Sequence, residues 1–440
     1  MTGLWNILMA LFAPAAQGGP LTIDQAVDIG ERQAFAVALQ RTRVENARQG
    51  VGAARAGLLP RATAGVTYSR FDPASFANLG AGAAVQVSPI EQRQGTLGAQ
   101  LPIDINGAIR GGIGVAENQY RASRYTLQAT FNDVRLNIRT AFFNVLRAQG
   151  SVAVQTQNVQ LAEAQLKQAQ LQFGQEQIAR VDVTRFEAAL AQARFDLANS
   201  QNQLGLARTN LNFLLNRPIE TEFTAADPGT LPTTPTSADA TVTSALAIRP
   251  ELRAIQAQRD ALRQQRRLTE AGDDPSLSVG VNYGRNFDVA GFSSRENSTT
   301  TSVTLSWPFF DGGATRYRVK QVRQDEEQAR IQLEQQKLTI SQEVRNALIN
   351  LTTARERLDN AERQVSLAEE VYRLAGVRRD AGEGTYVEVV DAQNQLVQAR
   401  NGAVNARYDY LTAYSQLQRA VGRDDLTAPV AATKEGEKKT

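Results

Sequence analysis

Residues 190–194 read Leu-Ala-Gln-Ala-Arg, and residues 396–400, which lie 206 positions further along the chain, read Leu-Val-Gln-Ala-Arg. The same shift places Pro102 on Pro308. A duplication of this length is far longer than the unit of an ordinary solenoid, which has about 20 to 50 residues. The chain is therefore predicted to contain two copies of one large module, each reading helix, β-hairpin, long helix, turn and helix.

The predicted boundaries follow from this duplication and from the turn-forming residues between the periodic segments. They are a first repeat at 21–220 with a β-hairpin at 61–105 and a helical hairpin at 107–217, a Thr- and Pro-rich linker at 221–243, and a second repeat at 244–425 with a β-hairpin at 275–310 and a helical hairpin at 313–422.

Both ends of the chain fall outside the repeats. Residues 1–20 contain a short apolar run followed by alanines, a pattern that indicates an export signal. No lysine or arginine precedes Arg32, so the basic start of such a signal is missing, and an apolar tail is the alternative. Residues 426–440 are predicted to form a disordered tail.

Apolar residues in the helical parts recur at alternating steps of three and four, which predicts coiled-coil seams. One such series is Val145, Ala148, Val152, Val159, Ala162 and Leu166, and its counterpart is Leu351, Ala354, Leu358, Val365, Ala368 and Tyr372. A helix from about residue 107 to 173 would be on the order of 100 Å long. The helices near 34–58 and 182–216, placed end to end, would have about the same length. We therefore predict that the chain reverses direction after the long helix and runs back until it meets the opening helix.

Four segments alternate apolar with small or polar residues, as strands do when one face is oily. The residues assigned to a lipid-facing side are Val66, Tyr68, Leu97, Leu101, Val279, Val281, Tyr283, Val303, Leu305 and Trp307. In a soluble sandwich the polar face would meet water. Strands of about ten residues, the length that a tilted membrane strand needs, with aromatic residues at opposite ends, favour a transmembrane β-barrel instead.

Four strands cannot close a barrel, and an open edge in lipid would leave backbone groups unpaired. The chain is therefore predicted to oligomerise. Two copies would supply about eight strands, whose interior is filled by side chains, whereas three would supply about twelve and leave a lumen. A homotrimer is the smallest assembly that makes a pore.

The composition excludes much chemistry. The 440 residues include no histidine and no cysteine, so disulfides, imidazole or thiolate metal ligands and the common nucleophilic triads are ruled out. We expect no enzyme activity, no cofactor and no metal site. The formal net charge of +3 comes from scattered basic and acidic residues and gives no reason to expect nucleic acid as a partner.

These features together resemble the TolC family of outer membrane efflux proteins. The similarity runs from Leu21-Thr22-Ile23-Asp24 through Arg249-Pro250-Glu251-Leu252 and Trp307-Pro308-Phe309-Phe310 to Gly384-Thr385-Tyr386-Val387-Glu388. It implies a mixed α and β membrane protein, in which long coiled-coil helical hairpins form a periplasmic α-barrel and four strands per chain contribute to a trimeric 12-stranded β-barrel in the outer membrane. It further implies an exit duct for efflux or type I secretion, working with a periplasmic adaptor and an inner-membrane transporter.

The resemblance also carries site residues. In the family, two acidic residues after the second turn constrict the periplasmic mouth, and they match Glu388 and Asp391; Asp182 and Arg185 are the first-repeat counterparts. The alternative is that these charges merely complement the helix dipole near a helix start. Gly384 stands where a well-known member of the family has an arginine that locks the closed mouth, so that lock is in doubt here.

The two helical turns match the tips that dock to the adaptor in the family. They comprise Gly174, Gln175, Glu176 and Gln177 in the first repeat and Gly382, Glu383 and Gly384 in the second. A glycine-containing turn is also what any helical hairpin requires. A soluble periplasmic scaffold or adaptor, built from the same hairpins, is the alternative function; it would not need four amphipathic strands.

Overall fold

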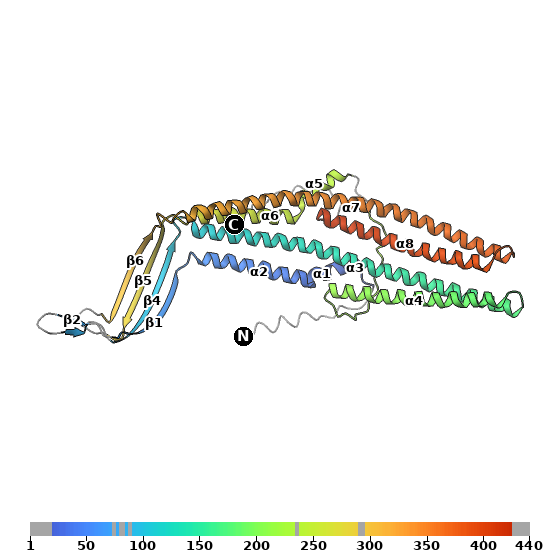
Figure 1. Cartoon of the computed structure of the whole chain (residues 1–440), viewed down its shortest axis with the longest axis horizontal. Coiled ribbons are helices and arrows are strands. Elements are labelled where there is room, and N and C mark those ends of the chain that lie inside the picture. The colour runs from blue at the N-terminus through green and yellow to red at the C-terminus, as the bar shows by residue number, and fades with distance from the viewer. Residues whose placement is uncertain are drawn as a thin grey trace. The chain divides into compact units, whose positions relative to one another are not determined.

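The computed structural model describes residues 20–72, 76–78, 84–86, 90–233, 237–288 and 295–424 (Figure 1). The predicted export signal at 1–20, except for Pro20, and the predicted tail at 426–440 lie outside the described residues. The chain divides into two compact units, and each unit contains segments of both repeats. The hairpin unit is Met1–Leu39, Gln128–Arg249 and Leu338–Thr440, and the sheet unit is Gln40–Leu127 and Pro250–Lys337.

The order of elements repeats as the sequence predicts. The first repeat contains α1 (Ile23–Gln33), α2 (Phe35–Ala56), β1 (Arg61–Arg70), β2 (Phe76–Asn78), β3 (Ala84–Gln86), β4 (Glu91–Ile103), α3 (Ala108–Gly174) and α4 (Arg180–Leu214). The second contains α5 (Ala238–Ile248), α6 (Pro250–Glu270), β5 (Ser276–Asn286), β6 (Asn297–Ser306), α7 (Ala314–Asp380) and α8 (Tyr386–Val421). Helices α3 and α7 have 67 residues each and start 206 positions apart, the same shift that relates the sequence repeats.

The sequence did not predict α1 and α5 as separate short helices. The linker predicted at 221–243 is interrupted by α5, because Ser237 caps that helix by accepting a hydrogen bond from the backbone N–H of Ala240. Helix α5 ends at Ile248, because Pro250 disfavours a helical backbone at the preceding residue, Arg249. A separate helix therefore precedes each of the predicted opening helices α2 and α6.

The sheet unit contains one four-stranded antiparallel sheet in the order β1-β4-β5-β6 (Figure 1). Residues directly opposite one another share a face. Leu101 lies opposite Val279, which lies opposite Val303, and Leu97 lies opposite Tyr283. All the predicted lipid-facing residues within the strands accordingly occupy one face, whereas Trp307 follows the end of β6.

The other face of the sheet carries small and polar residues. Gly98 lies opposite Thr63 and Asn282, and Gln100 donates a hydrogen bond from Nε2 to Ser278 Oγ at 3.2 Å. The apolar face is uncovered in a single chain: Val66 is 82% exposed and Val303 is 68% exposed. The polar face can meet water, whereas the apolar face needs a cover that the described part of one chain does not provide.

The hairpin unit pairs α3 with α4 and α7 with α8 along the predicted seams. Ala162, Leu190 and Ala193 form one buried cluster, and Ala368, Leu396 and Ala399, each 206 positions later, form the other. Two ion pairs are also related by the shift of 206 positions. Arg194 binds Glu163 at 2.9 Å and Arg400 binds Glu369 at 2.8 Å.

The returning helices end beside the N-terminal ends of the opening helices, at junctions with short helices that were not predicted. Asn216 Nδ2, just beyond α4, donates to the carbonyl of Gln33 at 3.2 Å. Arg249, between α5 and α6, donates to the carbonyl of Ala420 near the end of α8 at 2.9 Å. Among the described residues, no helix combines the length and apolarity required to cross a bilayer.

Candidate functional site

The turns that end the two helical hairpins have the same backbone geometry. In the first, the N–H of Gln177 bonds to the carbonyl of Gln172 at 2.9 Å around Glu176, whose φ is 56°. In the second, the N–H of Glu383 bonds to the carbonyl of Arg378 at 2.9 Å around Gly382, whose φ is 77°. The predicted tip residues thus lie at the ends of the hairpins, and all except half-buried Gly384 are exposed.

The left-handed position in these turns favours glycine, and only the second turn has one there. Replacing Gly382 by alanine is expected to lower the free energy of unfolding by about 1 kcal/mol, because a Cβ is strained at positive φ. Replacing Glu176 by glycine should not destabilise the first turn. Thermal unfolding of both variants checks this; equal losses at the two positions would contradict it.

Gly384 packs closely against the end of α7. A Cβ built on Gly384 would lie 3.0 Å from the backbone N of Arg379 and 3.1 Å from the backbone C of Arg378. A side chain here would require the end of α7 to move by a few tenths of an ångström. This gives a physical reason for the absence of an arginine at this position.

Glu388 lies in the first turn of α8. Thr385 caps this helix by accepting a hydrogen bond from the N–H of Glu388 at 3.3 Å. The Glu388 side chain is 44% exposed, and its Oε2 lies 3.5 Å from Nη1 of Arg378. Asp391 is exposed one turn later and makes no ion pair with any residue that the structure describes. Within one chain, Glu388 is partly compensated and Asp391 is not.

The first-repeat counterparts form a pair of their own. Asp182 lies in the first turn of α4 and is 20% exposed, and its Oδ1 is 3.4 Å from Nη1 of Arg185. Because the two charges cancel at short range, this position presents less net charge than the corresponding position on α8. Asp182 and Glu388, which the duplication relates, therefore differ in their ion-pair partners: Asp182 pairs with the next turn of its own helix, and Glu388 pairs with Arg378 on α7.

Tyr386 is a tip residue that the sequence analysis did not assign. Its hydroxyl donates to Gln172 Oε1 at 2.7 Å, and its ring meets that of Phe186 edge-on, with centroids 5.6 Å apart. Burial raises the pKa of the Tyr386 phenol, and the Arg379 guanidinium opposes that effect. Tyr386 ties α8 to both helices of the other hairpin. An aromatic residue at a helix start was the only signal for this role.

Aromatic residues lie near the two ends of the strands. Trp307, next to the helices, donates from Nε1 to the carbonyl of Asp273 at 3.1 Å and packs against Phe309. Tyr283, near the other end of β5, donates its hydroxyl to Asn297 Oδ1 at 2.9 Å. Each side chain combines an apolar ring with a satisfied polar group, which suits a membrane interface. Within the described ranges, no three acidic side chains gather as a metal ion would need.

Comparisons with known proteins agree with this geometry. A family model described as outer membrane efflux protein matches residues 31–217 and 241–423. The outer membrane protein TolC of Vibrio cholerae is 28% identical over 94% of this chain and 95% of its own length. The cobalt-zinc-cadmium resistance protein CzcC of Cupriavidus metallidurans is 23% identical over 93% of this chain and 92% of its own. The crystal structure of the Campylobacter jejuni CmeC outer membrane channel superimposes with a TM-score of 0.76, covering 95% of this chain and 91% of that one, at 17% identity.

Proposed function

Because this chain belongs to the family of outer membrane efflux proteins, we propose that three copies form the exit duct of a tripartite efflux or type I secretion system. The duct combines a 12-stranded β-barrel in the outer membrane with a helical tunnel in the periplasm. It receives substrates from a periplasmic adaptor and an inner-membrane transporter. The alternative of a soluble scaffold leaves the four amphipathic strands without a purpose, and the family match argues against it.

The observation that carries this proposal is the open sheet. In the part of the chain that the structure describes, β1 and β6 each pair along one edge only. Unpaired strand edges in lipid cost several kcal/mol for each backbone group, so the edges must pair with other chains. Joining β6 of one copy to β1 of the next repeats the same contact around a ring, and three copies give twelve strands and a lumen.

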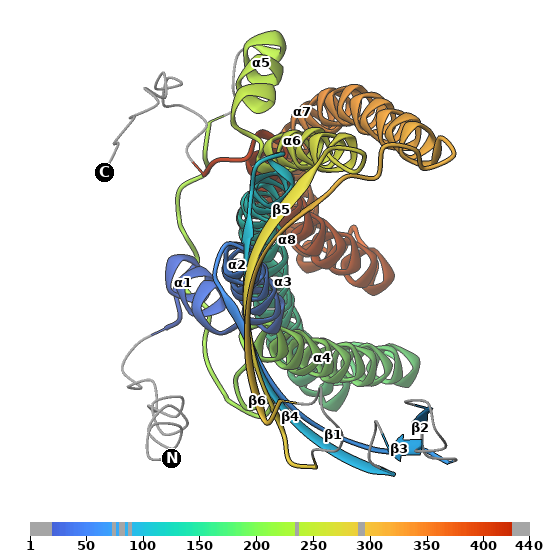
Figure 2. The same ribbon diagram turned by 90° about the vertical axis from the view of Figure 1, so that its left-hand side faces the viewer.

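The outer helices of the hairpin unit support the same ring. Helices α3 and α8 meet in the middle of this unit, where Gln393 Nε2 donates to Asn158 Oδ1 at 2.7 Å, and α4 and α7 lie on the outside (Figure 2). Both outer helices expose large apolar side chains: Phe195, Leu206 and Phe213 on α4, and Leu338, Ile349 and Leu367 on α7. An α4 surface that contacts the α7 surface of the next copy would cover both.

The mass of the detergent-solubilised protein tests the assembly. Light scattering or native mass spectrometry is expected to give three chains per particle. A monomer or a dimer as the only folded species would contradict the proposal, because neither closes a wide barrel.

For the mouth, we propose that Glu388 and Asp391 of the three subunits surround the periplasmic entrance and bind cations there. Since Arg378 compensates Glu388, Asp391→Asn should weaken block of single-channel current by multivalent cations more than Glu388→Gln does. Loss of an exposed charge–charge contact typically costs about 0.2 to 1 kcal/mol, which changes binding by a factor of about 1.5 to 5. High salt should reduce the difference between the variants.

The matched control is the double variant Asp182→Asn/Arg185→Gln, because it removes an ion pair and so leaves the net charge of this position unchanged. Its cation block should stay close to that of the unmodified channel. If Asp391→Asn leaves block unchanged while lowering the stability of the hairpin, the carboxylate is an ordinary helix-start charge. The proposal that the two turns dock an adaptor would be checked separately, by crosslinking from cysteines placed at Gln175 and Glu383.

A further inference from the structure

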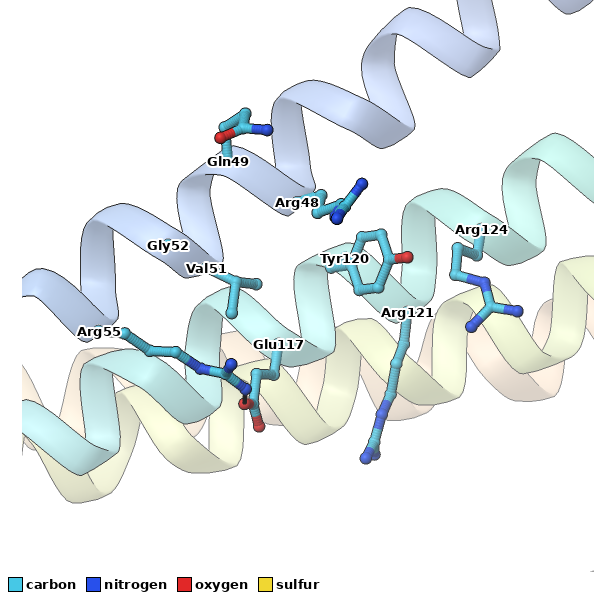
Figure 3. A pocket seen from close by; sticks show the side chains of 9 residues that line it. All are labelled: Arg48, Gln49, Val51, Gly52, Arg55, Glu117, Tyr120, Arg121 and Arg124. Atoms are coloured by element: carbon cyan, nitrogen blue, oxygen red, sulfur yellow. Dashed lines mark hydrogen bonds and ion pairs between the residues drawn. The ribbon is translucent and has the colours of Figure 1, made fainter. Parts of the chain in front are cut away.

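A groove in the sheet unit is lined by residues of α2 and α3 (Figure 3). Its volume is about 560 Å³, and four arginines line it: Arg48 and Arg55 from α2, and Arg121 and Arg124 from α3. Glu117 supplies the one carboxylate of the lining, and Tyr120 lies between the two helices. The groove belongs to a single chain and does not depend on the assembly proposed above.

The pairing of these arginines is incomplete. Arg55 Nη2 binds Glu117 Oε1 at 2.7 Å, and Arg48 Nη1 binds Glu45 Oε2 at 3.3 Å. On α3, Arg121 Nη1 donates to the neutral side chain of Asn118 at 3.4 Å, and the Arg124 guanidinium stands 5.9 Å from the Tyr120 ring. Neither Arg121 nor Arg124 forms an ion pair with any described residue, so no described carboxylate compensates the positive charge of these two guanidinium groups.

Neighbouring helices do not supply the missing negative charge. The long helical segments of the sheet unit carry 18 basic and nine acidic residues in total; they are α2, the first part of α3, α6 and the first part of α7. The whole chain, by contrast, has a net charge of only +3. A surface with such an excess of one sign concentrates ions of the opposite sign from solution. The groove is a hollow within this region and is lined by four arginines, although the Arg121 side chain points away from α2 (Figure 3).

We propose that the groove between α2 and α3 binds the phosphate group of an anionic ligand. Guanidinium forks match phosphate oxygens in pairs, and a phosphate can accept hydrogen bonds from several arginines at once. The volume exceeds what inorganic phosphate needs, which leaves room for an organic substituent.

One end of the groove, at Arg55, lies near the point where α2 is followed by the first strand. Helix α2 ends at Ala56, five residues before β1 begins, and α3 begins five residues after β4 ends. Basic pockets beside membrane-spanning segments bind the headgroups of anionic lipids. The phosphate could therefore come from a lipid headgroup or from a soluble phosphate compound, and the two sources need separate measurements.

The test uses the full-length protein in neutral detergent and compares two double variants of equal charge. Arg121→Gln/Arg124→Gln removes the two unpaired groove arginines. The control, Arg263→Gln/Arg330→Gln, removes two arginines outside the groove that pair with Asp260 and Glu327. Lipid binding is measured by native mass spectrometry with phosphatidylglycerol against phosphatidylcholine, and binding of inorganic pyrophosphate is measured by calorimetry at low salt.

The groove variant is expected to bind at least one probe about tenfold more weakly than the unmodified protein, because two charge-assisted hydrogen bonds are lost, while the control changes little. Loss in the phosphatidylglycerol arm identifies a lipid, and loss in the pyrophosphate arm identifies a soluble phosphate. Equal loss in the two double variants, or no saturable binding of either probe, would overturn the proposal. The native spectra report the number of chains at the same time, so failure of the assembly is seen separately.

Discussion

Replacing Arg249 by methionine is expected to destabilise the hairpin unit by about 3 kcal/mol, the lower end of what breaking a buried ion pair costs. Arg249 is 1% exposed and makes two hydrogen bonds to the end of α8 and one ion pair with α7. It donates to the carbonyls of Arg419 and Ala420, and its Nη1 lies 3.0 Å from Glu343 Oε2. Methionine fills much of the volume but supplies none of these hydrogen bonds.

The size of this effect depends on what remains after the substitution. Glu343 is 35% exposed and keeps a second partner, because Arg419 Nη1 lies 2.8 Å from the same carboxylate oxygen. The carboxylate is therefore not left alone, which places the expected loss at the lower end of the range. The α8 carbonyls lose their donor in a buried place, and each unsatisfied group costs about 1 to 3 kcal/mol.

Denaturant unfolding followed by the helical circular dichroism signal measures the change. The control is Arg345→Met on α7, because Arg345 is 59% exposed and its partner Asp239 is 88% exposed. Exposed pairs of this kind contribute about 0 to 1 kcal/mol. Arg249→Lys should fall between the two, because one ammonium group keeps the charge but cannot reach every acceptor. Equal losses for Arg249→Met and Arg345→Met would show that Arg249 does not hold the end of α8.

The periodic parts of this fold could be predicted from the sequence because their pattern is dictated by local geometry. A step of three and four fixes which side of a helix is buried, so the seams around Ala162 and Ala368 follow from spacing alone. Alternation in the strands fixes their faces in the same way. The register of the sheet then brings Leu101, Val279 and Val303 together without further information.

Contacts between distant segments could not be predicted, because no spacing rule connects them. The sequence analysis noted Arg249 as part of a motif, but its role depends on the carbonyls of α8, 170 residues away. Tyr386 binds Gln172 across 214 residues. The pairing of Glu388 with Arg378 depends on how the second turn folds back, and it changes which acidic residue is expected to dominate at the mouth.

Placing an arginine at Val281 is expected to destabilise the barrel by about 2 to 4 kcal/mol per chain, as a charge does at the lipid-facing midplane of such barrels. Val281 lies midway along β5, between Ala99 on β4 and Thr301 on β6, and it is 44% exposed in the single chain. If its face meets hydrocarbon, the guanidinium must lose its water or draw water into the bilayer.

Asn282 provides the matched control, since it is the next residue on the same strand and points to the opposite face. It lies between Gly98 and Thr300, among the small polar residues. Asn282→Arg should cost much less than Val281→Arg, because a lumenal arginine stays hydrated. Equilibrium unfolding from lipid vesicles measures both free energies.

Position along the strand supplies a second check. Leu305→Arg, one residue from the end of β6, should cost less than Val281→Arg because an arginine near the interface reaches water. Equal losses at Val281 and Asn282 would mean that both faces of the sheet meet the same medium, which a lipid-embedded barrel with an aqueous lumen does not allow.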